Sequence, residues 1–158
     1  MPEKVLYVAG ATGYIGREIV RCALELGYTV HASVRPNSET AMPQNDRLIL
    51  DILKTERDKT VFNIPMGASV ISCISSRTGT ATDAHNIDYQ MNMSLMNCAR
   101  SSDTKVFLML SAICVQKPKL AFQHAKLKFE GALQTSGLNY SIIRPTAYFK
   151  SLTVRFNV

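Results

Sequence analysis

Three glycines near the amino terminus have the type and spacing that bind the pyrophosphate of a dinucleotide. Gly10, Gly13 and Gly16 follow the apolar, β-branched run Val5–Val8, and an amphipathic helix pattern begins directly after them. A strand, a tight turn and a helix N-terminus in this order present backbone N–H groups to phosphate. We expect Gly10 to permit the sharp exit from the strand, Gly13 to let phosphate approach the backbone, and Gly16 to let the helix pack closely on the sheet. The loop also contains Thr12, Tyr14 and Ile15, and the alternative is a strand–turn–helix corner without a ligand.

The residue after the second expected strand indicates which dinucleotide is bound. Enzymes that use the unphosphorylated cofactor place an acidic residue about 20 residues after the glycine loop. Here the strand ends Ser33-Val34-Arg35 instead. A guanidinium pairs bidentately with phosphate, so Arg35 favours a cofactor that carries a 2′-phosphate, NADPH. The alternative is an arginine that is only exposed to solvent.

Further candidates lie at the carboxyl ends of other expected strands, where ligands of parallel sheets bind. Asp51, after the third strand, has two interpretations of equal weight: an acceptor for the adenine amino group, or the N-cap of a following helix. Cys73 and Ser75 lie at the end of the fourth strand and are expected to line the nicotinamide. Ser111 ends the fifth strand and can donate a hydrogen bond to the substrate or to the carboxamide of the cofactor. Without a neighbouring base it is not a nucleophile, and a turn serine is the alternative.

The elements that position these residues alternate between strand and helix along the chain. Ile15, Ile19, Ala23 and Leu26 recur at helical spacing, so the first helix is expected to bury that face. Strands are expected over residues 28–34, 47–52, 68–74, 104–111 and 140–144, helices over 54–62, 83–101 and 120–136, and a loop or short helix over 36–46. This alternation predicts an α/β fold, a doubly wound parallel sheet of the Rossmann type covered on both faces, with strand order 3-2-1-4-5-6.

Composition narrows the class of protein. The 158 residues fit one domain, and the net charge of +6 suits an anionic small ligand. A nucleic-acid surface is disfavoured, because the basic residues cluster only within 117–128. The four cysteines are scattered without a metal-binding spacing and are expected to be small buried residues, so no metal is predicted.

Several longer segments resemble one known family. GATGYIG with Arg35 is similar to the atypical short-chain dehydrogenases/reductases, which share an NmrA-like NAD(P)-binding domain. Within that group, the segments 72–80, 87–90, 110–130 and 140–152 resemble the divinyl chlorophyllide 8-vinyl reductases, and the similarity runs from about Val5 to Leu152. The resemblance implies an oxidoreductase of chlorophyll biosynthesis that uses NADPH to reduce the 8-vinyl group of a tetrapyrrole to ethyl.

One departure from the superfamily pattern bears on the chemistry. Ordinary members carry Tyr-x-x-x-Lys, in which tyrosine protonates a carbonyl oxygen and lysine binds the nicotinamide ribose. The matching residues here are Phe122 and Lys126. Phe122 cannot donate a proton, which argues against carbonyl reduction and is compatible with hydride delivery to a conjugated C=C. The resemblance assigns Lys126 to the ribose and Ser111 to the catalytic serine position, and the alternative for Lys126 is a solvated lysine. His124 and Tyr148 are proton donors by type only.

The resemblance stops before the chain does. Residues 153–158 do not resemble the family's continuation, which predicts an NAD(P)-binding domain over 1–152, a tail over 153–158 and a missing substrate lobe. No targeting peptide precedes the first strand, so a bacterial cytoplasm or the plastid stroma is expected. The expected partner is a tetrapyrrole, with peripheral membrane association as an option and the oligomeric state open. The competing hypotheses are a non-catalytic NADP(H)-binding sensor or interaction module, and a reductase of small phenolics similar to isoflavone reductase.

Overall fold

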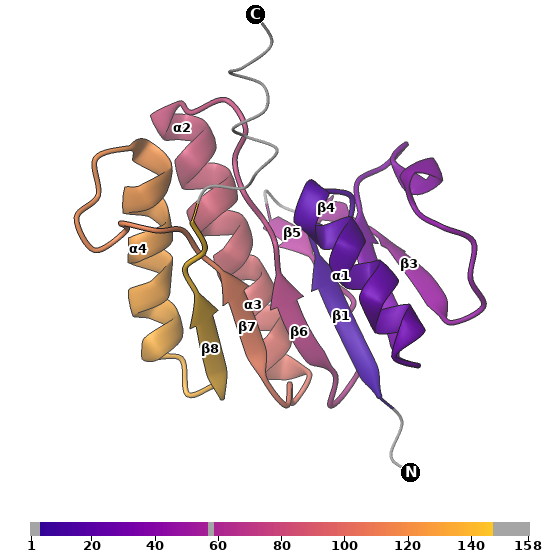
Figure 1. Ribbon diagram of the computed structural model, residues 1–158. Coiled ribbons are helices and arrows are strands. Elements are labelled where there is room, and N and C mark those ends of the chain that lie inside the picture. The colour runs from indigo at the N-terminus through magenta and orange to yellow at the C-terminus, as the bar shows by residue number, and fades with distance from the viewer. Residues whose placement is uncertain (1–3, 57–58, 147–158) are drawn as a thin grey trace, which may run out of the picture.

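Apolar, β-branched runs form a parallel sheet in the computed structural model, which describes residues 4–56 and 59–146 (Figure 1). The six strands are β1 (Val5–Ala9), β2 (Thr29–Val34), β3 (Leu48–Ile52), β6 (Ser69–Ser72), β7 (Phe107–Leu110) and β8 (Tyr140–Ile143). Their order across the sheet is β3-β2-β1-β6-β7-β8, and all neighbours are parallel. The predicted Rossmann order is therefore confirmed. Since the order reverses between β1 and β6, the crevice for a ligand opens at their carboxyl ends.

Outside residues 54–62, the helical elements follow the predicted alternation, with one change of helix type. They are α1 (Tyr14–Glu25), η1 (Glu39–Ala41), α2 (Ala81–Asp83), η2 (Ala84–Met91), α3 (Asn92–Ser101) and α4 (Ala121–Gln134). Three of them, α2, η2 and α3, follow one another where a single helix was predicted, and η2 has π-helical hydrogen bonding. A π-helical turn changes which side chains face inward, and Asp88, which lies in η2, is completely buried.

The prediction of a helix over residues 54–62 is wrong. It forms an antiparallel pair of short strands, β4 (Lys54–Glu56) and β5 (Lys59–Val61). β-branched residues such as Thr60 and Val61 favour extended backbone, and the segment is too short to bury a helical face. Phe62, directly after β5, packs edge-on against the ring of Tyr7. Phe62 therefore packs on the face of β1 that lies opposite α1.

Side chains alternate along β1 between two separate cores, as a strand requires. Leu6 and Val8 face α1 and pack with its buried residues Val20, Ala23 and Leu24. Tyr7 and Ala9 face the opposite side, where they pack with residues of α3, α4 and the segment after β5. Helices thus cover both faces of β1, as predicted.

Two predictions about burial are corrected. Leu26 is 69% exposed, because α1 ends at Glu25 and its buried stripe runs instead through Val20, Ala23 and Leu24. The cysteines are not uniformly buried, since Cys22 and Cys114 are exposed.

The helices do not cover the sheet evenly. On the side of α1, Ile143 of β8 is 45% exposed, because α1 packs on β1 and β2 at the other half of the sheet.

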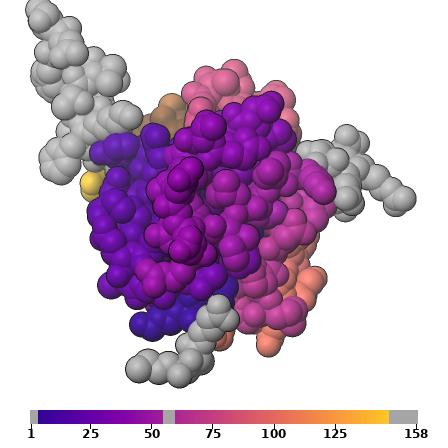
Figure 2. All heavy atoms as spheres, turned by 90° about the vertical axis from the view of Figure 1, so that its right-hand side faces the viewer, coloured from indigo at the N-terminus to yellow at the C-terminus, as the bar shows by residue number. Residues whose placement is uncertain are grey.

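The edge of the sheet at β3 is built almost entirely from the amino-terminal segments, coloured indigo to magenta in Figure 2. Ile49 and Ile52 of β3 are 45% and 43% exposed there.

No helix of the described residues is both long and apolar enough to cross a bilayer. The predicted boundary between residues 152 and 153 lies outside the described residues.

Candidate functional site

The glycine loop leaves β1 and enters α1 through a tight turn. Gly10 has a φ of +77°, and a Cβ at this position would lie 2.8 Å from the Cys73 carbonyl oxygen, so both the turn and the close neighbour require glycine. The Gly13 amide donates to the Gly10 carbonyl at 3.1 Å and closes the turn. Gly13 is then the N-cap of α1, and the first turn of that helix carries no acidic side chain. The positive end of the α1 dipole is therefore available to an anion.

Gly16 packs against this turn more closely than against the strands. A Cβ on Gly16 would lie 2.2 Å from the Gly10 carbonyl oxygen and 2.9 Å from the Ala11 Cα. Such distances are impossible without a shift of the backbone. The prediction that Gly16 permits close packing is thus sharpened, because its contact is with the glycine turn itself.

A cleft of about 940 Å³ opens at the carboxyl ends of β1, β6 and β7. It brings together nearly all the residues predicted for the site, namely Gly10, Thr12, Gly13, Tyr14, Ile15, Gly16, Arg35, Cys73, Ser75, Ser111 and Lys126. Arg35 is exposed directly after β2, at the end of the cleft near the glycine loop. The neighbouring Ser33 hydroxyl accepts a hydrogen bond from the Gly10 amide at 3.2 Å and so links the end of β2 to the glycine turn.

Asp51 does not line this cleft. It is buried, and its carboxylate accepts hydrogen bonds from the Tyr7 hydroxyl and from the backbone and side-chain amides of Asn63. Its interpretation as a helix N-cap is wrong, because β4 follows it and not a helix. Both carboxylate oxygens have donors within the protein, so Asp51 ties β1 and β3 to the segment after β5.

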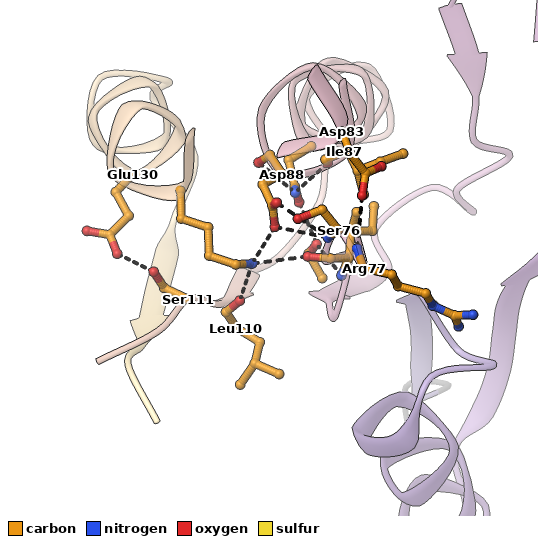
Figure 3. A network of polar contacts seen from close by, with 12 residues as sticks. Ser76, Arg77, Asp83, Ile87, Asp88, Leu110, Ser111 and Glu130 are labelled. Atoms are coloured by element: carbon orange, nitrogen blue, oxygen red, sulfur yellow. Dashed lines mark hydrogen bonds and ion pairs between the residues drawn. The ribbon is translucent and has the colours of Figure 1, made fainter. Parts of the chain in front are cut away.

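Lys126 is 3% exposed, so the alternative of a solvated lysine is wrong. Its ammonium donates to the carbonyl oxygens of Ile74 and Leu110 at 3.1 and 3.3 Å. The third neighbour is Asp88 Oδ1, which is 3.3 Å away and completely buried. Figure 3 shows Asp88 and Leu110 approaching this point from two different elements. Burial lowers the pKa of Lys126, and the negative charge of Asp88 opposes this effect.

Ser111 contacts a second buried carboxylate. Its hydroxyl donates to Glu130 Oε1 at 2.5 Å, a contact marked in Figure 3, and Arg144 donates to both oxygens of the same carboxylate. Burial by itself raises the pKa of Glu130, but the hydrogen bonds from Arg144 and Ser111 and the nearby positive charges outweigh it. The pKa of Glu130 is therefore held below its ordinary value.

The loop between β6 and α2 forms one wall of the cleft. Asp83 Oδ2 accepts from the backbone amides of Arg77 and Thr78, each at 3.0 Å, and from the Thr78 hydroxyl at 2.9 Å. These bonds, those from Thr78 first, lower the pKa of Asp83. Ser76 donates its amide to the Asp88 carboxylate, so the loop is fixed at both ends. At its start, burial raises the pKa of the Cys73 thiol to about 11, which leaves the thiol protonated at neutral pH.

Sequence reasoning missed Asp88 and Glu130. A signal for each was present: Glu130 lies four residues after Lys126 on α4, and Asp88 lies four residues before Asn92, so both pairs share a helix face.

Of the proposed proton donors, His124 is exposed and does not line the cleft, and Tyr148 lies outside the described residues. Phe122, which the sequence pattern matches to the superfamily tyrosine, lines the cleft. The described residues contain no cluster of three or more potential metal ligands.

Comparisons with known proteins agree with this geometry. Residues 10–156 match the model of a family described as NAD(P)H-binding. The chain is 40% identical to a chloroplastic divinyl chlorophyllide a 8-vinyl-reductase of Arabidopsis thaliana, over 92% of this chain and 39% of that protein. It is 29% identical to a photosystem II assembly factor, Ycf39, of Guillardia theta, over 97% of this chain and 49% of that protein.

Among solved structures, a UDP-galactose 4-epimerase superposes with a TM-score of 0.76 at 17% identity, over 89% of this chain and 55% of the epimerase, which supports the fold alone. The chain spans about two fifths of the length of the plant reductase that it matches. The glycine turn, the strand order and the match over residues 10–156 all lead to one assignment. The chain belongs to the NAD(P)H-binding family.

Proposed function

We propose that this chain binds NADPH and forms the nucleotide-binding part of a reductase that acts on the 8-vinyl group of a divinyl tetrapyrrole. The observation that carries the proposal is the cleft in which the glycine loop, Arg35 and Phe122 meet. The likeness to a plant 8-vinyl reductase, 40% identical over 92% of this chain, supports the substrate class. That relative is chloroplastic, so the same argument favours the plastid stroma.

The choice of NADPH over NADH rests on Arg35. Its guanidinium is exposed at the end of β2, where the ribose of the adenosine half lies in this fold. Asp51, the carboxylate predicted to contact the adenosine half, is buried and engaged by Tyr7 and Asn63. A 2′-phosphate therefore meets a cation at this position, and the one carboxylate in the described lining of the cleft, Asp83, accepts from the amides of its own loop.

NADPH, when bound, supplies a hydride, which reduction of a vinyl group to ethyl requires together with one proton. The residues of this chain contribute binding and orientation. Lys126 and its partners hold the carboxyl ends of β6 and β7, against which the nicotinamide would lie. Phe122 gives the cleft an apolar side chain and provides no proton, so the site is suited to a C=C acceptor better than to a carbonyl.

Calorimetry on this chain tests the cofactor. We expect NADPH to bind more tightly than NADH, and Arg35→Gln to weaken NADPH by about 10–100-fold while NADH is unchanged, which is the ordinary loss of a charge-assisted pair. Arg21→Gln is the matched control, because Arg21 is an exposed arginine paired with Glu18 and Glu25 on α1. Equal affinity of the unaltered chain for both cofactors would contradict the assignment of Arg35.

A chimera tests the substrate, because the chain spans only 39% of the length of the plant reductase. In it, this chain replaces the matching segment of the plant protein. Incubation with divinyl chlorophyllide a and NADPH is expected to give the monovinyl product, seen as a blue shift of the main absorption band. A chimera that binds NADPH and gives no product contradicts the reductase.

That last outcome favours a second candidate, a non-catalytic NADP(H)-binding module. Two observations support it. Phe122 removes the superfamily's proton donor, and the three partners of Lys126 within the protein account for all the protons of its ammonium. The likeness to a photosystem II assembly factor, 29% identical over 97% of this chain, points the same way.

A further inference from the structure

The cleft carries more positive charge than the glycine loop and Arg35 explain. Its described lining includes three arginines, Arg17, Arg35 and Arg77. The only carboxylate of that lining, Asp83, is occupied by the amides of its own loop. Lys126 also lines the cleft, but Asp88 balances its charge. The uncompensated charge therefore belongs to the arginines, and they suit a ligand with several anionic groups.

Arg77 lies on the wall opposite Arg35. It belongs to the loop after β6, whereas Arg35 follows β2, and β1 with its glycine turn lies between these two strands. Figure 3 shows the Arg77 side chain extending away from Ser76 and Asp88. None of the ion pairs found among residues 4–56 and 59–146 includes Arg77. Its guanidinium thus faces the cleft with its donors available to a ligand.

The backbone beneath Arg77 is held in place before any ligand arrives. Its own amide donates to Asp83 Oδ2 at 3.0 Å, and the Thr80 hydroxyl accepts from the Asp83 amide at 3.2 Å. The Thr80 hydroxyl therefore caps α2, and the Asp83 carboxylate holds the loop at residues 77 and 78 against the helix. A side chain on a fixed backbone loses less freedom on binding, which strengthens the contact that it makes.

We propose that Arg77 binds the nicotinamide-side phosphate of the dinucleotide, opposite the amino terminus of α1. This inference rests on the proposed function, because it presumes a dinucleotide across the switch point. The adenosine half then lies over β2 with Arg35, and the nicotinamide half lies over β6 and β7. The pyrophosphate would lie between them, in the cleft that both Gly13 and Arg77 line. One arginine thus recognises the 2′-phosphate and the other the pyrophosphate.

Binding of four nucleotides by Arg77→Gln tests the assignment. We expect the Kd values of NADPH, NADH and ADP-ribose to rise by one common factor of about 10–100, as for a lost charge-assisted pair. The Kd of 2′,5′-ADP, which lacks the nicotinamide-side phosphate, is expected to stay unchanged. Arg35→Gln gives the opposite pattern, weakening NADPH and 2′,5′-ADP only. Arg77→Lys, which keeps the charge and loses the bidentate fork, is expected to lie between.

The control is Arg100→Gln, which removes the same charge from an exposed residue in the last turn of α3 and is expected to alter no Kd. Unchanged binding of NADPH and NADH by Arg77→Gln overturns the proposal. Arg77 would then be a candidate to bind a carboxylate of the substrate instead. Weakening of NADPH and 2′,5′-ADP alone also overturns it, since that pattern assigns Arg77 to the 2′-phosphate. An unaltered chain that binds NADH but not NADPH contradicts the proposed cofactor, and the effect of Arg77→Gln on NADH still decides the role of Arg77.

Discussion

The ammonium of Lys126 lies 3.3 Å from the Asp88 carboxylate, in a place where both side chains are almost completely buried. Two carbonyl oxygens, at the ends of β6 and β7, accept its remaining protons. Lys126 therefore joins α4, η2 and two neighbouring strand ends at one point. To contact a nicotinamide ribose, it has to give up one of these partners or share it.

Asp88→Asn is expected to destabilise the protein strongly. The change leaves the Lys126 ammonium buried without a counter-charge, a situation that typically costs about 3–5 kcal/mol. Urea denaturation at pH 7 measures the free energy of unfolding. A value for Asp88→Asn within about 0.5 kcal/mol of the unaltered chain would show that the pair contributes nothing, in the range of ordinary surface changes.

The double variant Asp88→Asn/Lys126→Met separates the charge from the packing. It removes both members of the pair, so no isolated charge remains buried, and we expect it to be more stable than Asp88→Asn alone. If the effects of Asp88→Asn and of Lys126→Met on the free energy of unfolding simply add, the two residues do not interact. The contact between them then contributes nothing to stability.

Glu130 is expected to make stability depend on pH in the acid range. Its pKa is below the ordinary value of 4.5 in the folded protein, where Arg144 and Ser111 donate to its carboxylate. The stabilisation is therefore fully present above about pH 4.5 and is lost as the pH falls through the lowered pKa. The free energy of unfolding is measured for Glu130→Gln and for the unaltered chain at pH 7 and at pH 3. The difference between the two proteins should be smaller at pH 3. A difference that is the same at both values contradicts this account.

The fold was predictable because its signals are local. The run Val5–Val8 and the glycines after it act within a few residues and predict β1 and α1, and the alternation of strand and helix patterns predicts the strand order. The error over residues 54–62 came from a short segment whose extended form is stabilised by the contact of Phe62 with Tyr7. That contact joins distant parts of the chain, so no local pattern reveals it.

The same division applies to the site. The glycine loop and Arg35 are read from short stretches, and the structure brings them into one cleft. The burial of Lys126 is not visible in the sequence, because its carboxylate partner comes from η2, an element far from α4 in the chain. Asp51 follows β3 as predicted, yet its surroundings are set by Tyr7 and Asn63. Sequence spacing places a residue at a strand end, and only the packing determines what it contacts there.

Tyr7→Phe tests the structural role of Asp51. Burial, followed by the hydrogen bond to Asp51, raises the pKa of Tyr7 far above its ordinary value, so the hydroxyl is a permanent donor. Its removal leaves one buried carboxylate acceptor short of a partner, with an expected loss of about 1–3 kcal/mol in the free energy of unfolding. Tyr140→Phe is the control, since Tyr140 is 40% exposed and is expected to show no change. Equal stability of the two variants would show that Asp51 does not depend on Tyr7.

Two glycines in helices give the sharpest test of the turn. Gly16→Ala places a Cβ 2.2 Å from the Gly10 carbonyl oxygen, so the backbone of the loop has to move. We expect a loss of about 1–3 kcal/mol, as for other overpacked sites, together with weaker binding of NADPH.

Gly131→Ala on α4 is the matched control. Its Cβ meets nothing within 4 Å, and alanine favours the helix, so a gain of about 0.5–1 kcal/mol and unchanged binding are expected. Thermal unfolding and calorimetry of the two variants separate the alternatives. If Gly16→Ala were destabilised and still bound NADPH with full affinity, the turn would be required for the fold and not for the ligand. The glycine loop would then no longer support a dinucleotide site at this position.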